Sequence, residues 1–309
     1  MMRAGDIDTI APALAGAAEL LRQHGRQAKK SWGQNFLHDP RVVARIVEAA
    51  AIQPTDVVVE IGAGLGALTG ALAARAARVL AIERDRELAS LLRQAFAGAA
   101  SVTIVEANAL TFDFAAVGSA ERLVVVGNLP YNIASPLLFR LLEARAHLRS
   151  ATVMLQRELA QRLVAGPGSR RYGVPSVLLQ QHADLQTCLQ VGRGAFVPAP
   201  RVDSTVIRLD FRTVPRAPAD DAALRLTVRT AFGMRRKTLL RALSAAFPEH
   251  AVAAALAECG IDPRARAETL TVAQFAALAQ ALPAPAPGSA ASAADTLGPA
   301  LDLADDAAD

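Results

Sequence analysis

Cysteine is scarce in this chain of 309 residues, since Cys188 and Cys259 are its only two. Their separation matches no zinc-binding motif, and two thiols cannot build a disulfide framework. We therefore expect two reduced thiols, no bound metal and a cytoplasmic protein.

Aromatic residues (4%) and long apolar runs are also few. The stretch 123–139 comes nearest to a membrane span, but Gly, Asn and Pro interrupt it. The N-terminus carries aspartates and lacks a cationic segment followed by an apolar one, so we expect no signal peptide and no membrane partner. Enough Leu, Ile, Val and Phe remain for a sizeable core, which excludes wholesale disorder.

Basic residues are absent from the tail that begins at Pro283, which contains five aspartates. Without this tail the net charge of +4 becomes +9, from 33 basic and 24 acidic residues in 1–282. A basic body favours an anionic partner, nucleic acid first.

β-rich runs and helical patterns alternate through the first two thirds of the chain, which predicts an α/β fold with a Rossmann-like, doubly wound, mostly parallel sheet. The expected strands are Val57–Ile61, Arg78–Ile82, Val102–Val105, Leu123–Val126 and Ala151–Leu155. The expected helices are Gly66–Ala76, Arg84–Phe96, Ser135–Glu143 and Arg157–Ala165.

Two further β runs, Leu185–Val191 and Thr205–Phe211, flank a Pro-rich turn and suit an antiparallel pair at one sheet edge. From Asp220 to Leu282 three helical patterns follow, indicating a smaller all-helical domain. We expect four parts: an N-terminal extension with a short helix around Pro12–Leu21, a cofactor-binding domain, a helical RNA-docking domain and a disordered acidic tail. Their expected ranges are 1–25, 26–215, 216–282 and 283–309.

A glycine-rich turn, with Gly62, Gly64 and Gly66, joins the first expected strand to the first helix. Glycines there allow a ligand to approach the backbone closely. Glu83 ends the second strand, where a carboxylate can accept hydrogen bonds from both ribose hydroxyls of a nucleoside. The glycine-rich turn and Glu83 taken alone also fit a dinucleotide-binding enzyme. They could equally be a structural glycine turn with an incidental surface glutamate.

Two polar residues favour S-adenosylmethionine over NAD. Glu60 ends the first strand, where a carboxylate would attract a sulfonium or ammonium and repel a diphosphate. Asn108 follows the third strand and could hydrogen-bond an adenine edge, although it could equally be a turn or cap asparagine.

The segment GNLPYN, which starts at Gly127, follows the fourth strand and suits chemistry on a base amine. The Asn128 side-chain oxygen and the Leu129 carbonyl can accept hydrogen bonds from that amine and aim its lone pair at a methyl group. Pro130 stiffens the turn and favours an extended Leu129. Tyr131 offers a ring on which a flipped base can stack.

The segment 225–241 contains six basic residues and no acidic one, which indicates a surface that binds RNA phosphates. A second basic stretch lies near the N-terminus. The first set comprises Arg225, Arg229, Arg235, Arg236, Lys237 and Arg241; the second comprises Arg22, Arg26, Lys29 and Lys30.

Five ordered motifs resemble those of the small-subunit (16S) ribosomal RNA adenine N6,N6-dimethyltransferases, the family of the bacterial kasugamycin-resistance methyltransferase. They are KKSWGQNFLHDP, VEIGAGLGALT, GNLPYNIASPLLF, AFVPAPRVDSTVIRL and AFGMRRKTLLRAL, and the resemblance runs from about Arg26 to Leu282. It implies S-adenosylmethionine as the methyl donor and two adjacent adenosines, in the hairpin loop near the 3′ end of 16S RNA within an immature small subunit, as the targets. We expect the protein to act as a monomer.

The resemblance also implies roles for individual residues. Asn35 and Leu37 would close over the cofactor, with Gly62 under its methionine part and Glu83 at its ribose. Asn128 and Tyr131 would meet the target adenine, with Phe196 stacking from the opposite side. The chain departs from the family at Asn108, where Asp is usual, and at Trp32, where Phe is common.

Three alternatives stay open from the sequence. The first is the related large-subunit RNA methyltransferase that confers macrolide resistance, although the AFVPAPRVDS and MRRKTLL segments favour the small-subunit branch. The second is a ribosome-assembly or transcription factor that kept the fold and lost catalysis. An NAD dehydrogenase comes last, because no catalytic set for hydride transfer is evident.

Overall fold

The computed structural model describes residues 34–118 and 122–283. The described residues form two compact units, the first made of those up to 160 together with 185–211, and the second of 161–184 together with those from 212 onward. Residues 161–184 thus belong with the helical unit, whereas the sequence analysis put them in the cofactor-binding domain. The expected helix at Pro12–Leu21, the basic stretch that ends at Lys30, Trp32 and the acidic tail from 284 lie outside the described residues.

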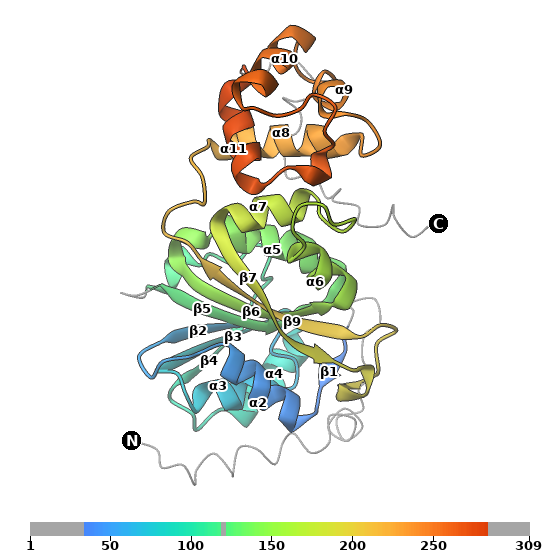
Figure 1. Ribbon diagram of the computed structural model, residues 1–309. Coiled ribbons are helices and arrows are strands. Elements are labelled where there is room, and N and C mark those ends of the chain that lie inside the picture. The colour runs from blue at the N-terminus through green and yellow to red at the C-terminus, as the bar shows by residue number, and fades with distance from the viewer. Residues whose placement is uncertain (1–33, 119–121, 284–309) are drawn as a thin grey trace. The chain divides into compact units, whose positions relative to one another are not determined.

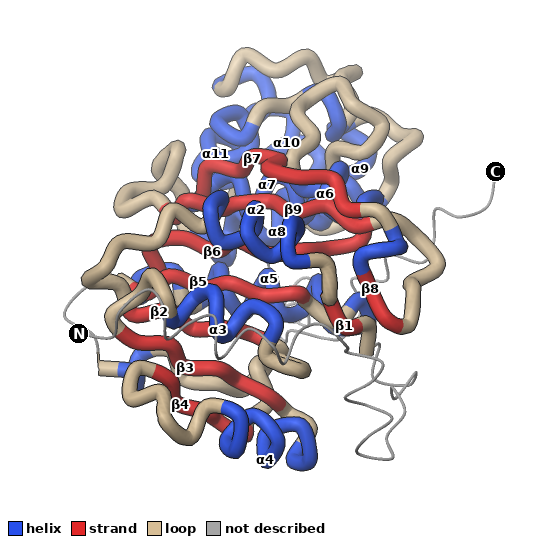
Figure 2. The backbone as a smooth tube through the Cα atoms, turned by 90° about the horizontal axis from the view of Figure 1, so that it is seen from below, coloured by secondary structure: helices blue, strands red, loops and turns tan. Residues whose placement is uncertain are grey.

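A seven-stranded sheet has the order β4-β3-β2-β5-β6-β9-β7, and Figure 2 shows these strands side by side. Strands β4, β3, β2, β5 and β6 run parallel to one another, and β9 runs antiparallel to β6. The strands are β2 (Val57–Ile61), β3 (Arg78–Glu83), β4 (Val102–Glu106), β5 (Leu123–Asn128), β6 (Leu148–Gln156), β7 (Ala183–Val191) and β9 (Ser204–Phe211). The expected Rossmann-like fold is confirmed, with β9 and β7 adjacent at one edge.

Helices cover both faces of this sheet (Figure 1), with α2, α3 and α4 on one side and α5 on the other. Their bounds are α2 (Pro40–Ala49), α3 (Ala67–Ala73), α4 (Arg86–Ala95) and α5 (Ala134–Glu143). Asp39 and Asp85 cap α2 and α4 by accepting a hydrogen bond from a backbone N–H of the first turn. Helix α2 was not expected, although the Asp39-Pro40 start and its apolar periodicity could have revealed it.

The strands read as continuous runs of Val and Ile because both faces of the sheet are buried. Val58, Val124 and Val126 pack against α2 and α3 in one core cluster. The alternate residues Val59 and Val125 are equally inaccessible to solvent. The rigid sheet fixes the loops at its carboxyl edge.

A second, two-stranded sheet pairs β1 (Phe36–Leu37) with β8 (Phe196–Val197) in antiparallel register. It joins the segment before α2 to the loop between β7 and β9. The described part of the first unit also contains the short 3-10 turns η4 (Ala115–Val117), η5 (Tyr131–Ile133), η6 (Arg145–His147) and η7 (Arg193–Ala195).

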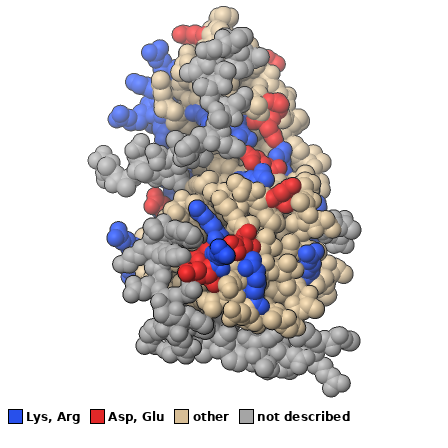
Figure 3. Space-filling view, turned by 180° about the vertical axis from the view of Figure 1, so that it is seen from behind, with Lys and Arg blue, Asp and Glu red and all other residues tan. Residues whose placement is uncertain are grey.

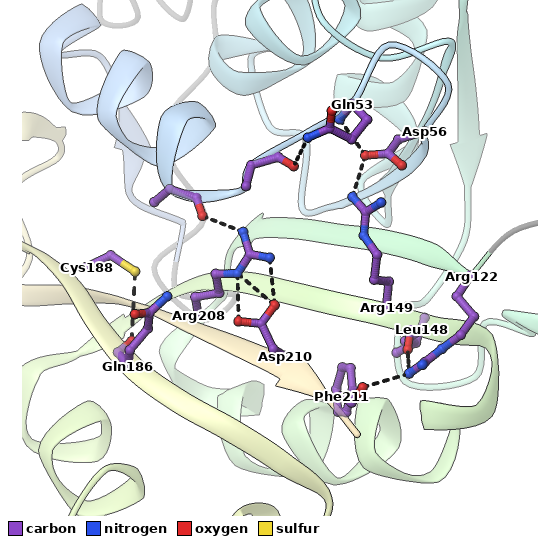
Figure 4. A network of polar contacts seen from close by, with 12 residues as sticks. Gln53, Asp56, Arg122, Leu148, Arg149, Gln186, Cys188, Arg208, Asp210 and Phe211 are labelled. Atoms are coloured by element: carbon purple, nitrogen blue, oxygen red, sulfur yellow. Dashed lines mark hydrogen bonds and ion pairs between the residues drawn. The ribbon is translucent and has the colours of Figure 1, made fainter. Parts of the chain in front are cut away.

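Arginines tie together strands near the amino-terminal edge of the main sheet (Figure 4). Arg149 pairs with the buried Asp56 at 2.5 Å, and Arg122 donates to the carbonyls of Leu148 and Phe211. These contacts satisfy backbone carbonyls and one oxygen of a buried carboxylate, so we assign them to the stability of the fold.

The described part of the second unit is mainly helical, with α7 packing against α8 and α11. Its elements are α6 (Arg157–Leu163, which begins in the first unit), α7 (Val174–His182), α8 (Asp221–Gly233), α9 (Leu239–Leu243), α10 (Glu249–Glu258), η8 (Ala267–Thr269) and α11 (Val272–Ala281). Tyr172, Phe232 and Phe275 form an aromatic core with ring centroids 5.7 and 6.0 Å apart. The expectation of three helices after Asp220 was wrong, because the described residues there form four: α8, α9, α10 and α11.

Candidate active site

A cavity of about 290 Å³ opens at the carboxyl edge of the main sheet, where the strand order reverses between β2 and β5. In doubly wound sheets this is the usual place for a ligand. Its lining includes residues that follow β2, β3, β4 and β5, together with the segment around β1. The expected residues Asn35, Leu37, Glu60, Gly62, Gly64, Glu83, Asn108, Asn128, Leu129, Pro130 and Tyr131 all line it.

The glycine turn at the base of the cavity has positive φ at Gly62, Gly64 and Gly66. A Cβ on Gly64 would lie 3.2 Å from the ring of Phe36, so the turn and the β1 segment pack closely. Both carboxylate oxygens of Glu83 face backbone N–H groups, from Gly64 at 2.9 Å and Asp85 at 2.8 Å. Each oxygen retains a lone pair, so Glu83 can hold the turn and still accept from a ligand hydroxyl.

Glu60 lies beneath the same turn and is 1% exposed. Its carboxyl group accepts a hydrogen bond of 2.6 Å from the Thr69 hydroxyl. Burial raises the pKa of Glu60 to about 8, against the weaker opposing effect of that hydrogen bond. A cationic ligand in the cavity would favour the charged form of this carboxyl group.

Asn108 forms a local turn in which its Oδ1 accepts from the Leu110 N–H at 3.1 Å. The Asn108 carbonyl accepts from Thr111. The turn interpretation of Asn108 is therefore right, and it is compatible with the cofactor role because the residue also lines the cavity. Asn108 can donate from its side-chain N–H groups, and Oδ1 keeps one lone pair, whereas a carboxylate would present a second, unengaged oxygen as an acceptor.

Asn128 is the last residue of β5, and its side chain contacts the segment that precedes β1. Its Nδ2 donates a hydrogen bond of 3.0 Å to the Asn35 carbonyl. The preceding Gly127 allows β5 to approach β2, because a Cβ there would lie 2.7 Å from the Ile61 carbonyl oxygen. The Leu129 N–H bonds to the Met154 carbonyl at 3.2 Å, which fixes the backbone after Asn128. The Asn128 Oδ1 is then left as an acceptor at the cavity.

Tyr131 stands in η5, and its hydroxyl lies 2.7 Å from the Ser204 hydroxyl. Ser204 begins β9 and is fully buried, whereas Tyr131 is half-buried and lines the cavity. Phe196 lies elsewhere: it is 2% exposed, packs in the core cluster with Leu37 and Met154, and does not line the cavity. The structure thus brings Tyr131, but not Phe196, to the place expected for a base.

Comparisons with known proteins decide the family. The sequence model of the ribosomal RNA adenine dimethylase family matches residues 25–283. The chain belongs to this family. The ribosomal RNA small subunit methyltransferase A of Myxococcus xanthus is 45% identical over 269 residues, which cover 85% of this chain and 94% of that protein. The enzyme of the same name from Anaeromyxobacter sp. is 47% identical over 275 residues, covering 85% and 96%.

Two solved structures are similar over about four fifths of the chain. A dimethyladenosine transferase from Plasmodium falciparum has a TM-score of 0.68 and 25% identity, covering 79% of this chain and 95% of its own. The 23S rRNA methyltransferase ErmE has a TM-score of 0.65 and 30% identity, covering 80% and 99%.

Membership of the ribosomal RNA adenine dimethylase family makes the chain a methyltransferase that takes its methyl groups from S-adenosylmethionine. The NAD-dehydrogenase alternative is therefore wrong. The cavity fits this cofactor: a glycine turn allows close approach, a buried carboxyl group with a raised pKa lies beneath it, and Glu83 offers acceptors.

The six basic residues expected to contact RNA all lie in the second unit, on α8, on α9 and in the loop between them. Arg236, Lys237 and Arg241 are exposed, while Arg225, Arg229 and Arg235 are partly buried. Arg235 donates a hydrogen bond from Nη2 to the Arg170 carbonyl, so part of its guanidinium group is engaged within the protein. Figure 3 shows Lys and Arg side chains gathered on this unit, at the upper left of the view.

Sequence reasoning missed three residues that shape the site. Phe36 packs on the glycine turn, Thr69 donates to Glu60, and Ser204 anchors Tyr131. All three lie within motifs quoted from the sequence, but only Ser204 stands out there, as a small polar residue at the start of an apolar run. The other two contacts depend on packing between segments.

Proposed function

We propose that this chain transfers methyl groups from S-adenosylmethionine to N6 of two adjacent adenosines in the hairpin loop near the 3′ end of 16S rRNA. Each adenosine becomes N6,N6-dimethyladenosine, so four methyl groups are transferred per subunit. The enzyme acts as a monomer in the cytoplasm, on an immature small subunit. Family membership and curated relatives named for the small subunit support the RNA class.

The cofactor would lie across the carboxyl ends of β2, β3 and β4. Gly62 and Gly64 would leave room for its methionine part, and Glu83 would accept hydrogen bonds from the ribose hydroxyls. Asn108 would contact the adenine, while Asn35 and Leu37 would close the cavity over the cofactor. S-adenosylmethionine would supply an electrophilic methyl group on a sulfonium sulfur, and the buried Glu60 would favour that positive charge in its ionised form.

One observation supports the catalytic assignment most strongly: the Asn128 amide is oriented by its hydrogen bond to the Asn35 carbonyl. This leaves Oδ1 to accept from the target N6–H, and the Leu129 carbonyl can accept the second one. Both acceptors turn the nitrogen lone pair out of conjugation with the ring and toward the methyl carbon. With S-adenosylmethionine bound there, N6 would take up the methyl group, the electron pair of the broken bond would stay on sulfur, and N6 would give up a proton to solvent.

No strong general base is needed, since orientation supplies most of the rate in such a displacement. Pro130 has φ −57° and carries no N–H, so it holds the turn open for the base. Tyr131 would stack on the flipped adenine. Phe196 lies in β8 and packs in the core of the first unit. Its stacking on the target base stays a prediction.

Phosphate contacts from the second unit would position the RNA without reading its sequence. Arg225, Arg229, Arg235, Arg236, Lys237 and Arg241 are the proposed residues, of which the three exposed ones offer the most accessible charge. Base selection rests on extrusion of the adenosine into the cavity.

Modification mapping in a strain that lacks the gene tests this function. We expect 16S RNA from that strain to carry two unmodified adenosines in the 3′ hairpin loop, which the restored gene converts to dimethyladenosines. Modification of 23S RNA instead would place the enzyme in the macrolide-resistance branch.

A further inference from the structure

A group of charged side chains lies beside the target-base subsite at the start of β9. Ser204, whose hydroxyl holds Tyr131, follows directly after Asp203. Burial raises the pKa of Tyr131, and the negative charge of Asp203 adds to the rise, so the carboxylate lies near the phenol. Asp203 is therefore part of the rim of the subsite.

Two arginines from separate elements converge on this carboxylate. Arg157, at the start of α6, places Nη1 3.3 Å from Asp203 Oδ2, and its backbone N–H donates to the Asp203 carbonyl at 3.0 Å. Arg193, in η7, places Nε 3.8 Å from Asp203 Oδ1. We call Arg157 and Arg193 the arginine clamp.

The arginine clamp carries more positive charge than its partner neutralises. Asp203 is the only acidic partner of Arg157 and Arg193 within residues 34–118 and 122–283, so the three residues together carry a net +1. Arg193 is also held on its other side, since its Nη1 donates to the carbonyl of the exposed Arg201 at 3.5 Å.

Both guanidinium groups remain available to a ligand. The side chains of Arg157 and Arg193 are 53% and 59% exposed, and ion pairs this exposed contribute only about 0–1 kcal/mol. A phosphate could therefore add to the cluster, or replace Asp203, at little cost. The arginine fork matches phosphate oxygens in geometry as well as in charge.

We propose that the arginine clamp binds the RNA phosphates that flank the target adenosine, at the rim of the base subsite. A base that swings out of its stack brings its own sugar and two phosphates to the mouth of the receiving pocket. Cations fixed beside Tyr131 meet those phosphates where the base enters. The clamp thereby aligns the extruded nucleotide and complements the proposed docking residues of the second unit. This inference rests on the proposed RNA methyltransferase function.

The test compares Arg157→Ala/Arg193→Ala with the wild type on undermethylated small subunits, with Arg75→Ala as the matched control. Arg75 is an exposed arginine of the same unit, just after α3, a helix that begins at the cavity edge and runs away from it. We expect the double variant to raise KM for the subunit about tenfold at physiological salt and to lower the slope of log affinity against log salt by about 1 for each arginine. S-adenosylmethionine affinity and melting temperature should match the wild type.

Arg157→Lys/Arg193→Lys should recover much of the salt slope, because it keeps both charges. An unchanged KM and slope in the alanine variant, with an active wild type, would overturn the clamp. A parallel loss in Arg75→Ala would overturn it too, because the effect would then be one of net charge. Lack of methylation by the wild type would refute the proposed function itself, and RNA binding by the same variants would still test the clamp.

Discussion

The Asn128 side chain donates a hydrogen bond from Nδ2 to the backbone carbonyl of Asn35, at 3.0 Å. This contact links the end of β5 to the segment that covers the cavity. The same hydrogen bond therefore helps to close the cavity over the cofactor and to orient Asn128 Oδ1, the proposed acceptor for the target amine. An amide suits this position because it donates on one side and accepts on the other.

Asn128→Ala should lower the rate of methyl transfer on the order of 100-fold, since it removes a positioned acceptor at the reacting nitrogen. Cofactor affinity should fall only a few-fold, through the lost contact with Asn35. Single-turnover kinetics and calorimetry separate the two effects. Equal losses in both measurements would mean that Asn128 serves mainly the cofactor.

Ser204→Ala and Tyr131→Phe should each lower kcat several-fold, because either change frees the ring of Tyr131 from its anchor. The two effects should not add in the double variant, since both remove the same hydrogen bond. Cofactor affinity should stay unchanged in all three variants. Additive losses would show that Ser204 acts on the rate independently of Tyr131.

Asn108→Asp should tighten S-adenosylmethionine binding about tenfold, near 1.4 kcal/mol. Aspartate can keep the bond from the Leu110 N–H and present a second oxygen, which would accept from the cofactor's adenine amino group. Calorimetry with the wild type as reference measures the change. Equal or weaker binding by the variant would contradict an adenine contact at this residue.

Glu60 makes a pH dependence testable. Its pKa of about 8 in the folded protein lies above its ordinary value near 4.5, so the fold binds an extra proton between these values. The contribution of Glu60 to stability is thus fully present below about pH 4.5 and declines as pH rises toward 8, by at most about 1.4 kcal/mol per unit. Denaturant unfolding of Glu60→Gln should lack this decline.

The affinity for the cofactor should change with pH in the opposite direction, through the same residue. A cationic ligand prefers the charged carboxylate, so wild-type affinity should rise from pH 6 to about 8 and then level off. The Glu60→Gln variant keeps an acceptor for Thr69 and should bind independently of pH in that range. Identical profiles for both proteins would place the cofactor's charge away from Glu60.

The sequence was most informative where local chemistry determines structure. Runs such as Val57–Ile61 form strands because β-branched residues suit a buried parallel sheet, and Gly62 marks the turn that follows. Two-residue strands such as Phe36–Leu37 leave no periodic signal, and their pairing with Phe196–Val197 depends on segments far apart in the chain.

Long-range packing also explains the site residues that the sequence did not place. Phe196 was expected at the base but is buried in the core, since neighbours from β1 and β6 decide its environment. Arg157, Arg193 and Asp203 come together from three separate elements, so their spacing in the sequence carries no trace of the cluster.

Counting methyl groups on undermethylated small subunits tests the central proposal most directly. Purified enzyme with isotopically labelled S-adenosylmethionine should transfer four methyl groups per subunit, two to each of two adjacent adenosines, while Asn128→Ala should transfer almost none in the same time. Tight cofactor binding by the wild type without any methylated adenosine would contradict the proposal and favour an assembly factor that has lost catalysis.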